Sequence, residues 1–333
     1  MKRLAHAAAL LAALLAAPGA APADQGFYAK TAEYQGIPIK AAAVVGDEAL
    51  LKARESLARL LSKTPDIVWN LRAEGAELHL IGRDQKASDL PEYRHYKGQL
   101  WEGEVDFDER ARGLGDRTVA CAEENLLSLP TDRFDDHREV CIHEIAHAIM
   151  GYGVSEAVRR KIVRQYRRSM GRGLWRTSYA AKTPDEFFAE LAMWYHAAEG
   201  NAGELGGIMG SGPQWLGSYD PEAYKLIDDI LSAREPVERL VELRPLPADR
   251  EEGLRPRFWG KATAITVVNG TPRELQAVRL TYWGKRKHCG KVMPGEPFRV
   301  ETRAAQPWLF LDDGGKVLAI FVAEPRPGFA AVR

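Results

Sequence analysis

The stretch CIHEIAHAIMGYG, residues 141–153, places two histidines four positions apart, with a glutamate directly after the first. Residues four apart lie on one face of an α-helix, so His143 and His147 can both point a ring nitrogen at one metal ion. Glu144 would then lie within reach of a water bound to that ion. The alternative is an amphipathic helix whose isoleucines face the core and whose histidines face solvent. The spacing favours a helix with a zinc site.

Two histidines leave a catalytic zinc site incomplete, because such a site normally has three protein ligands and a water. The longer metzincin pattern requires Gly and His after the second histidine, and Met150 and Gly153 stand at those positions. The third ligand is therefore expected further along the chain, and the segment 178–195, SYAAKTPDEFFAELAMWY, offers the best candidates.

Two glutamates in this segment lie one helical turn apart. Thr183 and Pro184 have the form of a helix start, which places Glu186 where its carboxylate could simply complete a capping box. Against that reading, Glu190 lies on the same face as Glu186, with two phenylalanines on the opposite side. Two carboxylates facing a two-histidine helix predict one ligand and one group that orients a ligand.

HEIAH followed by Tyr179, seven residues ahead of the first Glu of EFFAE, resembles the catalytic domain of anthrax lethal factor-type metallopeptidases, a gluzincin group that includes secreted proline-directed endopeptidases. The likeness covers roughly residues 115–200. It implies a zincin-like fold and a zinc cofactor, with His143, His147 and Glu186 as ligands. It also implies that Glu144 is the general base, that Tyr179 donates a hydroxyl to the developing oxyanion, and that Glu190 supports the ligands.

The general chemistry of zinc agrees with these roles, because zinc lowers the pKa of its water and a carboxylate can accept the proton as that water attacks a carbonyl. Tyr179 could instead be a core tyrosine with a satisfied hydroxyl. Glu123 and Glu124 follow an apolar stretch, TVACAEENLL, that could form an edge strand. Since zincins commonly bind peptides by adding a strand, these two residues are candidates for the substrate cleft.

The three cysteines are Cys121, Cys141 and Cys289. The first two lie close together in sequence, one before the HEIAH segment and one at its start. In an oxidising compartment we expect a Cys121–Cys141 disulfide and a free Cys289, the alternative being two buried thiols.

The N-terminus has the form of a signal peptide. A basic start precedes an apolar run that is too short to span a bilayer, and Ala21-Pro22-Ala23 resembles a cleavage site. We expect residues 1–23 to be removed and the protein to be secreted or periplasmic, with no membrane span after cleavage. The chain has 46 basic and 46 acidic residues, and this balance excludes the basic footprint of a nucleic-acid-binding protein.

The rest of the catalytic part should contain a strand at 37–45, a helix after Gly46-Asp47 and a strand at 76–82. Further helices are expected at about 137–150, 154–170 and 184–199, with one more beginning at Asp220. These elements predict an α+β domain over 24–242, with an N-terminal lobe at 24–115 and the catalytic helices at 116–242. Residues 243–257, rich in Pro and charge, are expected to be a linker.

Residues 258–333 contain short alternating runs, which predict a small all-β sandwich. This part resembles the β domain of the von Hippel-Lindau tumour suppressor in Asn269, Pro272, Val278, Leu280, Pro294-Gly295 and the run from Trp308 to Asp312. That family binds hydroxyproline in a pocket of two Trp, a Tyr, a Ser and a His. Here only Trp308 is kept, and Arg279, Cys289 or His288, Thr302 and Gln306 stand at the other positions. The domain could hold a protein or cell-surface target, or be structural with Trp308 in its core.

Together these features predict a secreted zinc endopeptidase that acts on a protein or peptide substrate. One alternative is an exported binding protein on an inactive metallopeptidase scaffold. The other is a zinc hydrolase of a non-peptide amide or ester, which would use the same residues.

Overall fold

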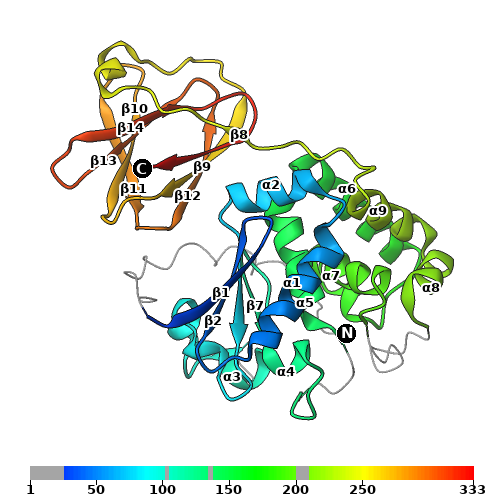
Figure 1. Ribbon diagram of the computed structural model, residues 1–333. Coiled ribbons are helices and arrows are strands. Elements are labelled where there is room, and N and C mark those ends of the chain that lie inside the picture. The colour runs from blue at the N-terminus through cyan, green and yellow to red at the C-terminus, as the bar shows by residue number, and fades with distance from the viewer. Residues whose placement is uncertain (1–25, 102–104, 134–137, 200–209) are drawn as a thin grey trace, which may run out of the picture.

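The computed structural model describes residues 26–101, 105–133, 138–199 and 210–333. It contains mixed helices and sheets, so the predicted α+β class is confirmed. The helices gather with a five-stranded sheet in the first two thirds of the chain, and the last third is all β (Figure 1). The expected signal peptide at 1–23 lies outside the described residues. Over the described part of the chain, no helix is both long and apolar enough to cross a membrane.

The five-stranded sheet has the order β1-β2-β3-β7-β6. Its strands are β1 (Tyr28–Tyr34), β2 (Ile37–Ala42), β3 (Glu77–Ile81), β7 (Thr118–Ala122) and β6 (Gly113–Leu114). β3 runs parallel to β2 and β7, whereas β1 and β6 are antiparallel to their neighbours. The expectation that 118–130 holds an edge strand is wrong, because β7 is paired on both sides and the short β6 forms the edge.

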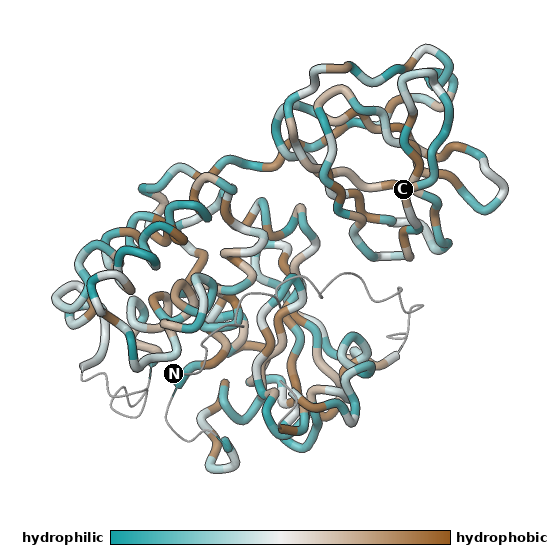
Figure 2. Tube along the Cα trace, turned by 180° about the vertical axis from the view of Figure 1, so that it is seen from behind, coloured by the Kyte–Doolittle hydropathy of each residue, from teal (hydrophilic) through white to brown (hydrophobic). Residues whose placement is uncertain are grey.

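Helices cover one face of this sheet (Figure 1). The helices that contact the sheet are α1 (Asp47–Leu61), α2 (Pro65–Ala73), α4 (Glu123–Leu126) and α5 (Val140–Ala148). A second layer of helices, α6 (Glu156–Gly171), α7 (Pro184–Tyr195), α8 (Gly212–Tyr219) and α9 (Pro221–Leu231), packs on them through the contact of α7 with α5. Their inward residues join the strands in one apolar core, visible as the brown interior of Figure 2. The predicted cap of α9 is confirmed, since the Asp220 side chain accepts a hydrogen bond from the backbone N–H of Ala223.

The opposite face of the sheet is covered by short segments. These are η1 (Ala87–Asp89), η2 (Pro91–Tyr96), α3 (Phe107–Arg110) and the paired strands β4 (Leu100–Trp101) and β5 (Val105–Asp106). Ile81 and Ala120 of the sheet pack there against Leu90 and Phe107 in a separate small core. The central strands β3 and β7 are therefore buried on both faces, whereas one face of β1 is exposed.

Two helices end differently from the prediction. α5 was expected to end near Gly151, but it continues as one π-helical turn, η3 (Ile149–Gly153), closed by a hydrogen bond from the N–H of Val154 to the C=O of Ile149. α7 was expected to reach residue 199, but Ala197 adopts φ 52° and the Ala198 N–H bonds back to the Met193 C=O. This is the usual closing turn of a helix, formed here on alanine instead of glycine.

The last third contains two four-stranded sheets, β11-β10-β13-β14 and β12-β9-β15-β8. The strands are β8 (Val241–Glu242), β9 (Ala262–Asn269), β10 (Leu275–Leu280), β11 (Arg286–Val292), β12 (Pro297–Arg303), β13 (Pro307–Leu311), β14 (Val317–Val322) and β15 (Gly328–Val332). Apolar residues from both sheets form one core, including Ile265 and Val267 from one and Phe310 and Phe321 from the other.

The segment 243–257 does not behave as a free linker. Leu243 is buried in the core of the all-β part, and Leu246 forms a β-bridge with Ile320. Farther along, η6 (Ala248–Gly253) packs on β14, and Glu251 pairs with Arg286. The apolar residues of segment 243–257 therefore belong to the β part. The stretch that connects the two parts lies before β8.

The two parts of the chain touch through the end of α2. Glu74, which is buried, accepts a hydrogen bond from Thr266 Oγ1 at 2.7 Å and pairs with Arg299. Trp69 donates its indole N–H to the Leu240 C=O at 2.9 Å and packs edge-on against Phe329. Separating the two parts here would leave the buried Glu74 carboxylate without its cationic partner, which is costly. The ion pair therefore favours one orientation of α2 against the β part.

Candidate metal centre and active site

The two motifs singled out in the sequence lie on neighbouring helices. Ile142, Ile145 and Ile149 of the HEIAH segment are buried against the sheet, and this orientation turns the two histidines toward α7. His143 is itself only 7% exposed. The alternative interpretation of this helix required both histidines to lie on a solvated face, and they do not.

Three side chains converge where α5 and α7 face each other. His143 Nε2 lies 3.1 Å from His147 Nε2 and 3.0 Å from Glu186 Oε2, and His147 Nε2 lies 3.3 Å from the same carboxylate oxygen. One ligand atom from each residue falls within 4.8 Å of the others. Two nitrogens and one oxygen meeting in this way form the donor set that zinc takes in catalytic sites, so the residues fit a zinc ion.

The helix cap and the candidate ligand role of Glu186 occur together. The backbone N–H of Glu186 donates to Thr183 Oγ1 at 3.1 Å, which is the predicted N-cap. The Glu186 carboxylate, however, contacts the histidines, so it is not used to complete a capping box. Burial alone would raise its pKa, but hydrogen bonds from His143 and His147 outweigh that effect and hold the pKa below its usual range.

Glu190 lies behind His143 and is fully buried. Its Oε1 is 3.1 Å from His143 Nδ1 and accepts a hydrogen bond from the Arg138 guanidinium at 2.6 Å. This contact fixes the ring so that Nε2 points toward His147 and Glu186. Burial alone lowers the pKa of His143, but the hydrogen bonds with Glu186 and Glu190 raise it to about 10. A buried carboxylate behind a metal-binding histidine is the arrangement that orients the ring and makes it more basic.

Glu144 lies beside the histidines and against the edge strand β6. Burial raises the pKa of its carboxyl. An added Cβ at Gly115 would lie 2.6 Å from Glu144 Oε2, and one at Gly113 would lie 2.6 Å from Oε1. Only glycine at these two positions leaves room for the carboxylate, so both take part in shaping the site. These glycines were not predicted as site residues, because they lie some thirty residues before Glu144 and nothing in the local sequence indicates which helix they approach.

Tyr179 lies at the start of η4 (Tyr179–Ala181), just before α7. Its ring centroid is 6.1 Å from that of His143, and Lys182 Nζ lies 4.2 Å from the Tyr179 ring centroid. Burial, followed by the charge of Glu186, raises the pKa of its hydroxyl to about 12. The hydroxyl therefore stays protonated at neutral pH and is available as a hydrogen-bond donor.

These groups open into one cavity of about 520 Å³. His143, Glu144, His147, Tyr179 and Glu186 line it. The rest of its lining includes aromatic and charged residues that the sequence did not single out: Tyr93, Tyr96, Trp101, Phe107, Arg110, Asp116 and Tyr152. A cavity lined by several aromatic residues and a polar cluster is typical of a site that binds an organic substrate.

Glu123 and Glu124 do not line this cavity, and their interpretation as cleft residues is wrong. Both are buried, at 0% and 2% exposure. Glu123 accepts backbone hydrogen bonds from Gly46 and Arg83, and Glu124 forms a two-pronged ion pair with Arg112. Both carboxylates therefore hold together loops at the ends of the strands.

The disulfide Cys121–Cys141 is present as predicted, with 5.3 Å between the Cα atoms. It joins the end of β7 to the first turn of α5. Cys289 is free and exposed, also as predicted. The helix that carries both histidines is therefore tied covalently to the sheet.

Trp308 lies on β13 and is 2% exposed, and its indole N–H donates to Thr302 Oγ1 at 3.1 Å. Together with Arg279, Cys289, Thr302 and Gln306 it lines a hollow of about 500 Å³. The residues expected, by resemblance, at the positions of a hydroxyproline pocket are thus gathered in one place. Their chemistry is nevertheless different, with a guanidinium, a thiol and an amide.

No protein-family model matches this chain, and no curated protein is significantly similar to it. A pro-pro endopeptidase from Paenibacillus alvei has a similar structure in part, with a TM-score of 0.40 and 18% sequence identity over 58% of this chain and 96% of that chain. A likeness of this degree leaves the function to the chemistry of the site.

Proposed function

We propose that this protein is a secreted zinc endopeptidase of the gluzincin type. The observation that carries the proposal is the meeting of His143, His147 and Glu186 within 4.8 Å, with Glu144 beside them in a cavity of about 520 Å³. An HExxH helix alone can be accidental. A carboxylate from a second helix at the same point makes an accidental cluster improbable, since it completes the three-ligand set of a catalytic zinc site.

A zinc ion held by these three residues would supply a Lewis-acid charge and a water of lowered pKa. Glu144 would take the proton of the attacking water and later deliver it to the leaving amine. Its burial next to Gly113 and Gly115 keeps other groups away from that path. The raised pKa of Glu144 suits a group that must first accept a proton and then release it.

Tyr179 and Glu190 would act on either side of the same centre. The protonated hydroxyl of Tyr179 would donate to the oxygen that becomes negative as the carbonyl is attacked, which is how such donors stabilise a transition state. Glu190 would act only as a positioning residue, by holding the His143 ring.

The remaining parts of the proposal concern the rest of the chain. The part from residue 24 through α9 would form the catalytic unit, and the β part from β8 onward would be an accessory domain. The Cys121–Cys141 disulfide supports an oxidising compartment, which fits secretion or the periplasm. A protein or peptide substrate fits a cavity whose lining includes several aromatic residues.

The test compares the mature chain with Glu144→Ala and with Glu222→Ala, a matched change of an exposed glutamate on α9. Bound metal is measured in all three proteins, and each is assayed on a diverse peptide library with and without chelator. We expect about one zinc in every protein and cleavage by the wild type and Glu222→Ala only.

Two results would overturn the proposal. Absence of zinc from the purified or zinc-supplemented wild type contradicts the ligand assignment. Zinc binding without cleavage of any peptide contradicts the substrate class, and the same proteins are then assayed on small amides and esters.

A further inference from the structure

Four aromatic side chains are exposed on two neighbouring loops of the all-β part. Phe258 and Trp259 are 69% and 97% exposed, and Tyr282 and Trp283 are 39% and 80% exposed. Of the residues that the structure describes, Trp101 in the catalytic cavity is the one other exposed Phe, Tyr or Trp. Nearly all exposed aromatic surface is thus collected at one place, far from what a random surface would show.

The two loops, residues 255–261 and 281–288 (the latter including the first three residues of β11), form a single surface. The rings of Phe258 and Tyr282 are stacked with centroids 4.1 Å apart and planes inclined by 6°. Arg255 lies over Gly284, where an added Cβ would come within 2.4 Å of the guanidinium carbon. The stack fixes the loops to each other, so Trp259 and Trp283 are presented together.

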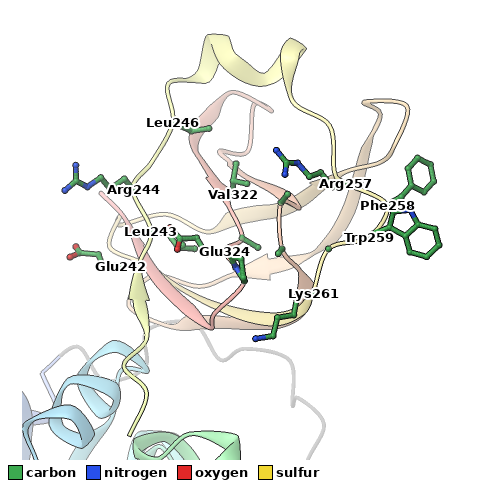
Figure 3. A pocket seen from close by; sticks show the side chains of 15 residues that line it. Glu242, Leu243, Arg244, Leu246, Arg257, Phe258, Trp259, Lys261, Val322 and Glu324 are labelled. Atoms are coloured by element: carbon green, nitrogen blue, oxygen red, sulfur yellow. The ribbon is translucent and has the colours of Figure 1, made fainter. Parts of the chain in front are cut away.

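The aromatic residues belong to the lining of two hollows, Phe258 and Trp259 to one and Tyr282 to the other, but the rings of Phe258 and Trp259 project outward. Figure 3 shows Phe258 and Trp259 pointing away from the hollow of about 890 Å³ that Arg257, on the same loop, faces. An exposed indole ring at the tip of a loop has a lower free energy in an apolar or interfacial phase than in water.

The charge of this surface has one sign. The two loops contain six basic residues and no carboxylate: Arg255, Arg257, Lys261, Lys285, Arg286 and Lys287. All six are exposed, and within the described chain only Arg286 forms an ion pair, with Glu251. The protein as a whole has equal numbers of acidic and basic residues, so this concentration of positive charge is local.

We infer that loops 255–261 and 281–288 are a docking surface for an anionic lipid bilayer. Tryptophan is the side chain that prefers the membrane–water interface, and a ring of Lys and Arg beside it is attracted by acidic headgroups. The two contributions come from the same two segments of chain, although Arg257 itself faces the hollow. The inference does not depend on the proposed peptidase activity, since no residue of the metal centre takes part.

Other partners fit the surface less well. A single-stranded nucleic acid is bound by aromatic faces left free along a groove, whereas Phe258 and Tyr282 cover each other's faces. A protein partner of matching charge would be expected to find both signs around the aromatic centre, and these loops provide only one. A bilayer of acidic lipids presents a single charge sign over an apolar layer, which matches the surface on both counts.

The experiment sediments the full mature chain with vesicles of phosphatidylcholine alone and of an equimolar mixture with phosphatidylglycerol, at low and high salt. We expect binding to the mixed vesicles only, weakened by salt. The double variant Trp259→Ala/Trp283→Ala should bind at least ~10-fold less, because two indole rings no longer enter the interface. The double variant Lys285→Gln/Lys287→Gln should lose about 10-fold.

Matched controls separate this surface from general stickiness. Leu51→Ser removes an exposed apolar residue on α1, and Arg164→Gln/Arg167→Gln removes two exposed cations on α6. Both should bind as the wild type does. Binding that is equal in the tryptophan variant, absent in the wild type, or transferred to single-stranded DNA would overturn the inference. Circular dichroism of each variant shows whether it is folded.

Discussion

Nδ1 of His143 lies 3.1 Å from Oε1 of Glu190, a carboxylate that is completely buried and also bound by Arg138. The ring of one candidate ligand is therefore oriented from behind by a charge. We expect Glu190→Gln to weaken zinc binding by about 10- to 100-fold, because the amide keeps the shape but not the charge. Zinc competition with a chromogenic chelator measures the change.

The control for this variant is Asp185→Asn, which removes an exposed carboxylate from the same helix. It should leave zinc affinity within a factor of about two, as expected for a surface charge. Equal affinities of wild type and Glu190→Gln would show that the contact does not support the ligand.

Tyr179→Phe removes a hydroxyl whose pKa is raised to about 12 and which is therefore protonated during catalysis. We expect kcat to fall by roughly 100- to 1000-fold with KM nearly unchanged, since the hydroxyl acts on charge that develops only in the transition state. Zinc content should stay the same. Tyr195→Phe, which removes a hydroxyl bound to Asp228, should retain full activity. A rise in KM alone would instead assign Tyr179 to substrate binding.

Gly115→Ala tests the space beside Glu144, the proposed general base. The new methyl group would lie 2.6 Å from Glu144 Oε2 and 2.7 Å from His147 Cβ, so one of these groups must move. We expect kcat/KM to fall about 100-fold, the cost of misplacing a reacting group by roughly 1 Å. Gly151→Ala, whose methyl would meet no atom within 4 Å, is the matched control and should be active. Wild-type activity in Gly115→Ala would show that the crowding is relieved without effect.

The disulfide should stabilise the catalytic part. Its cysteines are 20 residues apart, and closing a loop of that length raises the free energy of the unfolded chain by about 3 kcal/mol at room temperature, because the chain loses entropy. Urea unfolding of Cys121→Ser/Cys141→Ser should show a loss of this size, and Cys289→Ser should show none. If the wild type is equally stable with and without reductant, the disulfide does not contribute to stability.

His196 should make stability fall in mild acid. Burial, followed by the charges of Arg59 and Lys63, lowers its pKa to about 4, and its Nε2 has no hydrogen-bond partner among the described residues. Because the folded state resists protonation, the unfolded state binds the proton first, and stability is lost as pH falls from about 6.5 toward 4. The loss should reach ~3 kcal/mol at the lower limit.

The variant His196→Gln should lose less stability than the wild type between about pH 7.5 and pH 4.5, measured by urea unfolding at each pH. At the higher pH, protonation of His196 should not affect the free energy of unfolding, because the histidine is neutral in the folded and in the unfolded state. Parallel stability curves would contradict the prediction.

The parts that could be predicted from the sequence are those whose geometry is local. The four-residue spacing of His143 and His147 is set by the helix itself, and Asp220 caps α9 because the cap needs only its own next residues. The end of α7 was missed because Ala197 takes a conformation that is normally marked by glycine.

The walls of the site could not be predicted, because they depend on how strands are ordered in the sheet. Gly113 and Gly115 reach Glu144 only because β6 forms the sheet edge beside α5. Glu124 looked like a cleft residue after an edge strand. Its buried partner, Arg112, directly precedes β6, and the antiparallel pairing of β6 with β7 brings the two side chains together. The order of charges along the sequence does not reveal that pairing.

The position of β15 has a consequence for the order of synthesis. This strand lies between β9 and β8 and runs parallel to both, so the sheet β12-β9-β15-β8 is divided until it arrives. β9 and β12 can pair as soon as both have been made, whereas β8, the first strand of the β part, has no neighbour in its sheet until β15 follows. The complete sheet must wait, because parallel pairing over this separation cannot begin locally. During that interval Ile265 and Val267 have no cover on their strand edge, so this is the stage at which a chaperone would be most useful.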